Sequence, residues 1–559
     1  MLSTMKKVIA ASLIFLSQLL VYPAISAADS VPDEQYSLQG ASNSDSKNRI
    51  GVFFEDNADT LRMPTLLYSY SISTGRQSAE SFCNGLDDPS CAKASFMKYY
   101  SLMPPCKSST EVDCIESVYA IAPGAPARIK GIYRESIPEK VEHPFIADPA
   151  QGLPQGSVSG VWEIPNIKHG GGSTNFVAIV SRVGSLKKEG KSWQPIEQGD
   201  FRAGIYPVNI VRDSRYKANV PEITKREGYD SVSIGHPSQL PFDVCAIVGN
   251  GVCALRQTFP DDVQFGMVIR FSKVINGWMH GRIDSPEIDY ELTDYGTRVD
   301  MKGLSTRVPI AAGWTEPSNF TEVEKKNSNL QGTLGSTVHP RPSGISSMEA
   351  LNLWAKYLND KAVANPSQWI FYNLPEYDMQ AASSCIKTSK TLAGFITTNS
   401  TTYTASPPIY NEKSGTLDYS VASLHYLPDG KVFQGKYNLF IDSKVARCIY
   451  KFSTAPISAT VSITSADGAQ KSVATTTVTE NNGWIHLSAV GFTFSFPTIK
   501  VKLTQGDTAP QTASPTPVAS VPATKIEKPK RSTITCSKGI TTRKINAIDP
   551  RCPKGFTKV

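Results

Sequence analysis

Ten cysteines constrain this chain more strongly than any other feature of its sequence. Their number is even, and three pairs share the spacing C-x7-C. In an exported protein this pattern predicts disulfides between sequential cysteines, and the CxxC spacing of zinc and redox sites is absent. For the first four cysteines, spacing leaves three connectivities open. We therefore expect a stapled fold without metal or cofactor, and the candidate disulfide cysteines are Cys83, Cys91, Cys106, Cys114, Cys245, Cys253, Cys385, Cys448, Cys536 and Cys552.

Residues 1–28 have the three parts of a secretion signal. Lys6 and Lys7 precede an apolar run, and Ala24-Ile-Ser-Ala-Ala28 supplies the small residues of a cleavage site. No later stretch approaches the roughly 18 consecutive apolar residues that a membrane-spanning helix needs. We expect a secreted protein, extracellular or associated with the cell wall, with no transmembrane anchor in the mature chain.

Positive charge is concentrated at the end of the chain. The formal net charge is +7; residues from Lys525 onward contribute +8 and the signal peptide +2, which leaves the rest of the chain at −3. An electrostatic partner should therefore be sought at the tail. Its candidate binding residues are Lys538, Arg543, Lys544, Arg551, Lys554 and Lys558.

The fold class expected is mainly β, with several disulfide-stapled domains and minor helix. Turn signals such as Pro428-Asp-Gly430 and Asn481-Asn-Gly483 punctuate runs of β-formers and predict a sandwich-like C-terminal domain. Bridging Cys385 to Cys448 would stabilise that domain by about 4 kcal/mol. The expected organisation is a signal peptide (1–28), disordered leader (29–49), Cys-rich region (50–125), β domain (126–314), linker (315–345), helix plus sandwich-like domain (346–504), Pro/Thr/Ala-rich disordered linker (505–532) and small basic tail (533–559).

Two local elements can be predicted in more detail. Cys245-Ala-Ile-Val-Gly-Asn-Gly-Val-Cys253 reads as a hairpin in which the two cysteines lie opposite each other. Ser346-Ser-Met-Glu349 forms a capping box, and Leu351, Trp354 and Leu358 follow at helical spacing. We expect a helix there with one apolar face.

Three blocks resemble parts of uncharacterised secreted and cell-surface proteins of actinobacteria that share a basic two-Cys C-terminal tail. They are Thr535-Cys-Ser-Lys-Gly to Phe556, Asp442-Ser-Lys-Val-Ala-Arg-Cys448 with Gly491-Phe-Thr-Phe-Ser-Phe-Pro-Thr-Ile499, and Gly277-Trp-Met-His-Gly-Arg282. The resemblance implies that the protein is exported by a Gram-positive bacterium, and it assigns no activity to the protein.

No catalytic motif is complete. His169-Gly-Gly-Gly172 matches a lipase-type oxyanion segment, but the nucleophile turn Gly-x-Ser-x-Gly is missing, so we favour a glycine-rich loop. An acidic cluster could bind calcium or act as an acid/base pair, yet it lacks an ion-binding loop and is better interpreted as a solvated strand face. Its members are Asp284, Glu287, Asp289, Glu291 and Asp294.

Histidines and aromatic residues offer two further candidates. His280 and His486 each follow Trp in the shared pattern N-G-W-x-H, and without partners at metal-ligand spacing we interpret them as structural. Aromatic rings could stack on sugars, although most should pack in the core. Trp193, in a polar stretch, is the best candidate for an exposed ring.

Three functional hypotheses remain. The one we favour is a secreted, cell-surface-associated β-rich protein with a binding or structural role, retained by anionic cell-wall polymers that bind its tail. The alternatives are a secreted hydrolase of cell-wall polysaccharide or peptide, and a carbohydrate-binding protein whose partner is a glycan. The sequence has no nucleic-acid-binding motif, and we favour a non-enzymatic role.

Overall fold

The computed structural model divides the chain into two units, the body (Met1–Gln505) and the tail unit (Gly506–Val559). The predicted signal peptide and residues 506–531 of the predicted linker lie outside the described residues. The described residues are 32–38, 48–55, 63–73, 75–125, 127–196, 200–233, 244–327, 334–341, 343–453, 457–464, 470–472, 475–494, 497–505, 532–538, 541–547, 552 and 556–558.

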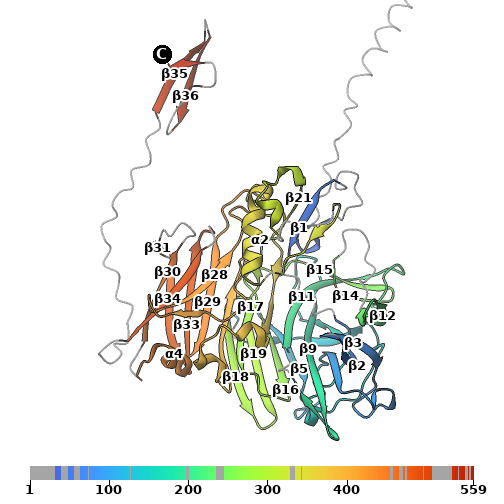
Figure 1. Ribbon diagram of the computed structural model, residues 1–559. Helices are drawn as coiled ribbons and strands as arrows, with labels where there is room; N and C mark the ends of the chain where they lie inside the picture. The colour runs from blue at the N-terminus through green and yellow to red at the C-terminus, as the bar shows by residue number, and fades with distance from the viewer. Residues whose placement is uncertain are drawn as a thin grey trace, which may run out of the picture. The chain divides into compact units, whose positions relative to one another are not determined.

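The chain is mainly β, with 52% of it in strands and 11% in helices, as predicted. A long sheet, here called the central sheet, runs through the body (Figure 1). Its main path is β3 (Arg76–Phe82), β2 (Leu66–Ser73), β4 (Phe96–Leu102), β9 (Asn175–Glu189), β11 (Asp200–Arg212), β24 (Ile370–Asn373), β17 (Gly277–Arg282), β25 (Leu392–Thr398), β29 (Gly435–Asp442), β33 (Trp484–Phe492) and β32 (Thr475–Asn481). Off this path it includes β7 (Ile132–Ile137), β8 (Ser159–Glu163), β10 (Ser192–Pro195), β14 (Cys245–Gly249) and β15 (Val252–Arg256).

Two smaller sheets face the central sheet. The first, here the β16 sheet, has the order β18 (Asp284–Thr293), β19 (Gly296–Leu304), β16 (Gln264–Phe271), β5 (Cys114–Ile121) and β6 (Ile129–Lys130). The second, the β28 sheet, has the order β26 (Thr402–Tyr403), β28 (Thr416–Ala422), β34 (Thr498–Gln505), β30 (Ile457–Thr464) and β31 (Gln470–Ser472), with β27 (Ile409–Asn411) beside β28.

In the middle strands β24, β25 and β29, both faces of the central sheet are buried, and side chains alternate between the two faces. In β29, Phe440 belongs to the core shared with the β16 sheet. Its neighbours Leu439 and Ile441 belong to the core shared with the β28 sheet. The β28 sheet and the β29 part of the central sheet therefore form the sandwich-like arrangement expected near the C-terminus.

The expected linker 315–345 does not separate two bodies. β17 precedes it in sequence and pairs in parallel with β25, which follows it. Within it, β22 (Thr337–Val338) pairs with β1 (Ile50–Phe54), which also pairs with β21 (Ala311–Thr315). The polar, Gly- and Pro-rich composition of this stretch marks surface connections within one unit, and residues before and after it share the same cores.

The leader expected to be disordered is in part ordered. Asp33–Gln35 form the short helix η1, and only 5% of Glu34 is exposed. The Glu34 carboxylate accepts hydrogen bonds from Thr258 Oγ1 at 2.7 Å and from Ser367 Oγ at 2.9 Å. A buried carboxylate with several donors holds this segment against the body, an arrangement that the polar composition of the leader does not reveal.

Four disulfides among the described residues match the sequential pairing: Cys83–Cys91, Cys106–Cys114, Cys245–Cys253 and Cys385–Cys448. Cys552 is also disulfide-bonded, whereas the side chain of its expected partner, Cys536, lies outside the described part of the chain. The Cys245–Cys253 hairpin has the expected Asn250-Gly251 turn, but a bulge changes its register. Cys253 lies opposite Val248 and Cys245 lies opposite Leu255, so the predicted direct opposition is wrong.

The predicted helix is present, but its predicted cap is not. α2 (Ile345–Ala355) is followed by the short helix η9 (Lys356–Leu358), and Leu351, Trp354 and Leu358 are buried as expected. The N-cap residue is Gly344, and no side chain caps the helix, so the capping-box prediction is wrong. Apolar side chains of α2 and η9 share one core with those of β1 and β21.

The remaining described elements are short. The hairpin β12 (Glu222–Arg226) and β13 (Tyr229–Ser233) packs against β3, and β20 (Thr306–Arg307) pairs with β23 (Ser367–Gln368). Cys385 lies in α3 (Ser384–Lys387) and Cys448 in α4 (Ser443–Tyr450), so their disulfide joins two helices. In the tail unit, β35 (Ser532–Lys538) pairs with β36 (Thr541–Ala547) and β37 (Thr557–Lys558).

Candidate functional site

His169 is a structural residue of the loop that leads into β9. Its Nδ1 atom accepts a hydrogen bond from the Gly171 N–H at 3.0 Å, so Nε2 carries the proton of the neutral ring and can donate to the Val208 carbonyl at 3.0 Å. Burial lowers the His169 pKa. Ser173 Oγ lies 2.8 Å from Nε2, but a protonated Nε2 cannot accept the serine proton. The geometry agrees with the glycine-rich loop and provides no Ser–His dyad.

The acidic cluster forms a solvated strand face, as we favoured. Glu287, Asp289 and Glu291 are exposed on β18, which pairs only with β19 among the described strands. Glu287 binds Lys302 Nζ at 2.9 Å, and Asp284 forms an ion pair with Lys436. Charged residues on an edge strand discourage pairing with another chain. Within the described ranges, no group of three or more His, Cys, Asp or Glu side chains could hold a metal ion.

The two histidines of the N-G-W-x-H pattern lie on separate strands of the central sheet. His280 on β17 is 2% exposed and is surrounded by tyrosines, with Tyr403 at 5.3 Å between ring centroids. Burial, and secondarily the charge of Arg282, lower the His280 pKa to about 3. His486 on β33 stacks on Phe440 at 4.0 Å, and burial lowers its pKa. Both are aromatic packing residues, which supports the structural interpretation.

Trp193 is not a sugar-stacking platform. It lies on β10 and is 2% exposed, so its ring belongs to a core beneath β4 and β9. The residues on either side of it, Ser192 and Gln194, are exposed. The polar stretch is therefore an alternating strand whose single large apolar residue points inward.

The basic-tail candidates are only partly described. Lys544 and Lys558 are exposed on strands of the tail unit. Arg551, Lys554 and the side chains of Lys538 and Arg543 lie outside the described residues. Anion binding by the tail therefore stays a prediction.

A pocket that the sequence does not predict lies where the central sheet meets the β12–β13 hairpin. We call it the tyrosine pocket, and its volume is ≈ 220 Å³. Its lining residues are Met63, Tyr68, Gln77, Ala79, Tyr100, Asp230, Ser231 and Val232. It combines aromatic faces with hydroxyl, amide and carboxylate groups.

One wall of the tyrosine pocket is an aromatic face of the central sheet. Tyr68 on β2 lies opposite Lys98 on β4, and Leu66 lies opposite Tyr100, so the two tyrosines are diagonal neighbours on one face. Tyr70 continues this face and stacks on Phe96 with ring centroids 5.4 Å apart. The alternation of β2 places these rings on the same side as the hairpin.

The opposite wall is held by contacts between the hairpin and β3. The Asp230 N–H donates to Ser78 Oγ at 2.9 Å, which fixes β13 over the sheet. The Asp230 carboxylate binds Lys225 Nζ at 3.1 Å, and the side chain of that lysine is 91% exposed. Because the lysine is so exposed, the ion pair is weak and the carboxylate can accept hydrogen bonds from another group.

The electrostatics of the tyrosine pocket disfavour an anionic ligand. Burial, followed by the neighbouring Tyr100 and Tyr70, raises the Tyr68 pKa above that of an ordinary tyrosine, so the phenol stays neutral and able to donate at physiological pH. Asp230 is the acidic group in the lining and would repel an anion. Hydroxyl groups are the natural donors to its carboxylate.

Sequence reasoning missed this site for a physical reason. Tyr68 and Tyr70 alternate with serines on β2, which signals two aromatic rings on one face. The pairing of β2 with β4, and the distant hairpin that covers them, depend on tertiary contacts that a local pattern does not encode.

Comparisons with protein-family models, with curated proteins and with solved structures found no match. Among the described helices, none is both long enough and apolar enough to span a membrane. The four disulfides are consistent with an extracellular protein.

Proposed function

We propose that this chain is an extracellular binding protein that recognises a sugar unit in the tyrosine pocket and is retained at a cell surface by its basic tail. The observation that carries the proposal is the combination in one pocket of Tyr68, Tyr100 and Asp230. Sugar rings present C–H faces that pack on aromatic rings and hydroxyl edges that donate to carboxylates and amides. Both requirements are met by the lining of the tyrosine pocket.

The size of the tyrosine pocket limits the ligand to about one ring. One water needs about 10–15 Å³ of such volume. The ≈ 220 Å³ available therefore corresponds to more than a dozen small groups. A hexose is of that size, whereas a drug-sized ligand needs roughly 300 Å³ or more. The proposal is accordingly one monosaccharide unit, either free or at the end of a glycan.

The tail supports the surface location through its charge. Residues from Lys525 onward carry +8, and two of these lysines, Lys544 and Lys558, are exposed. A locally cationic segment binds polyanions by releasing their counterions, and such binding weakens as salt increases. Retention by the tail is independent of recognition in the pocket, so either part of the proposal can fail alone.

A glycan array tests the recognition part. The body, residues 29–505, should bind a small set of glycans that share one terminal neutral monosaccharide, and Asp230→Asn should weaken binding to those glycans. Asp213→Asn is the matched control, because Asp213 also pairs with a neighbouring cation but lies outside the pocket. A body that binds no glycan, or an Asp230→Asn variant with unchanged binding, would contradict the sugar-binding proposal.

A further inference from the structure

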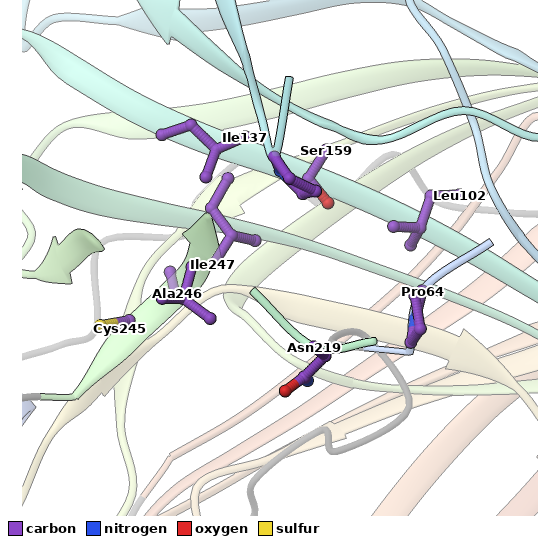
Figure 2. Close-up of a pocket in the computed structure, with 10 residues that line it drawn as sticks. Pro64, Leu102, Ile137, Ser159, Asn219, Cys245, Ala246 and Ile247 are labelled. Atoms are coloured by element: carbon purple, nitrogen blue, oxygen red, sulfur yellow. The ribbon is translucent and has the colours of Figure 1, made fainter. Parts of the chain in front are cut away.

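The β7–β8 strands separate a second pocket from the core that the central sheet shares with the β16 sheet. We call it the proline pocket. It is bounded by β7, β8, β14 and the approach to β2, and its volume is ≈ 50 Å³ (Figure 2). Its lining residues are Pro64, Leu102, Ile137, Pro138, Ser159, Asn219, Cys245, Ala246, Ile247 and Val248. Most of this wall is apolar, and two side chains in it are polar.

Both polar side chains have an oxygen atom without a partner. Ser159 is 3% exposed, and its Oγ atom forms no hydrogen bond. The Oδ1 atom of Asn219 is likewise buried without a partner. A buried polar atom without a hydrogen bond is costly, so such atoms in a native protein call for an explanation. Figure 2 shows Ser159 and Asn219 between two groups of apolar side chains, with Leu102 and Pro64 on one side and Ile137, Ala246 and Ile247 on the other.

The chemistry of the wall specifies the ligand class. No Lys, Arg, Asp or Glu is among the lining residues, so a charged ligand would be buried without a counter-ion. Asn219 Oδ1 requires a donor, and the Ser159 hydroxyl can either donate or accept. The apolar side chains on either side of them favour aliphatic carbon over water, which needs two to four polar partners.

We propose that the proline pocket binds a short, neutral aliphatic group with a hydroxyl at each end, one for Ser159 and one for Asn219. At about 10–15 Å³ for each water-sized group, the pocket holds about three to five such groups. A short diol, or the diol end of a longer chain, meets these limits. This site is separate from the tyrosine pocket and does not depend on the proposed sugar binding.

The test uses two probes of equal size. Propane-1,3-diol and butan-1-ol have the same number of non-hydrogen atoms, but only the diol has a donor at both ends. Saturation-transfer NMR titrations of the body should give saturable diol binding with a dissociation constant about fivefold lower than that of butan-1-ol, the factor supplied by one hydrogen bond of typical net strength.

Variants locate the binding site. Ser159→Ala should remove the preference for the diol, and Ser181→Ala should keep it, because Ser181 is a buried serine on β9 whose Oγ also lacks a partner but which does not line the pocket. Asn219→Ala, at a partly exposed position, provides the same test if Ser159→Ala does not fold. Equal or tighter binding of butan-1-ol, absence of saturable diol binding, or a preference that survives both pocket variants would overturn the proposal.

Discussion

The buried ion pair between Asp113 and Arg182 joins the Cys106–Cys114 loop to the central sheet. Asp113 is fully buried, and the side chain of Arg182 is 2% exposed. Asp113 also accepts hydrogen bonds from the Ser272 N–H at 3.0 Å and from Ser272 Oγ at 2.6 Å. One carboxylate therefore ties three separate segments together, and we predict that its charge is essential to the stability of the body.

Asp113→Asn isolates that charge. Asp113 has φ +54°, a conformation that Asn tolerates well, so the substitution adds little backbone strain. It leaves the Arg182 cation buried without its carboxylate, and breaking such a pair costs about 3–5 kcal/mol. For a body of this size the entropy of unfolding is about 1 kcal/mol per kelvin, so the midpoint of thermal unfolding should fall by roughly 3–5 °C.

Calorimetry and chemical denaturation of the body with its disulfides intact measure this loss. Asp113→Asn combined with Arg182→Met should be more stable than Asp113→Asn alone, because the stranded cation is removed. Glu163→Gln is the control: its pair with Arg134 is half-exposed and should contribute less than about 1 kcal/mol. A loss below 1 kcal/mol for Asp113→Asn, or a double variant no more stable than the single one, would refute the reasoning.

Three further predictions concern other parts of the chain. Replacing Cys385 and Cys448 by Ser opens a loop with a sequence separation of 63 and should lower the free energy of unfolding by about 4 kcal/mol in urea titrations; a loss below about 1 kcal/mol would contradict the loop-entropy argument. Because the His280 pKa is about 3 in the folded body and about 6.5 when unfolded, the unfolded chain binds the extra proton between these values. Stability should therefore fall as pH decreases from 6.5 towards 3, by up to about 1.4 kcal/mol per pH unit, and His280→Gln but not the exposed His339→Gln should flatten this dependence in acid-unfolding curves. Deleting residues 506–559 should move the protein from the cell-wall fraction to the medium, and salt should elute the intact chain; equal partition of both forms would contradict retention by the tail.

Local patterns predicted the parts of the fold that depend on near neighbours in sequence. The short C-x7-C spacings, the Asn250-Gly251 turn and the apolar face of α2 all follow from residues a few positions apart. Several failures come from packing between residues that are far apart in sequence. Trp193 lies in a polar stretch yet is buried, because its ring packs against side chains that are distant in sequence, such as Leu67 and Met97.

The division into domains failed for a related reason. Composition indicates where the chain is polar, but β17 and β25 join across the expected linker through backbone hydrogen bonds that have no compositional signature. The buried Glu34 is a smaller example, since its hydrogen-bond partners Thr258 and Ser367 are far away in sequence. The tyrosine pocket shows both cases. The alternation of tyrosine and serine in β2 can be recognised in the sequence, whereas the β12–β13 hairpin that covers these tyrosines cannot be predicted from it.

The most direct test of the proposed function is the affinity of pocket variants for a glycan identified on the array. Isothermal titration calorimetry should show that Tyr100→Ala raises the dissociation constant at least about tenfold, as expected for a tyrosine at the centre of a binding site. Tyr377→Ala, which removes a 62% exposed tyrosine outside the pocket, should leave it unchanged. Circular dichroism should show that both variants fold. Equal affinities for Tyr100→Ala and the unmodified body would contradict sugar recognition in the tyrosine pocket.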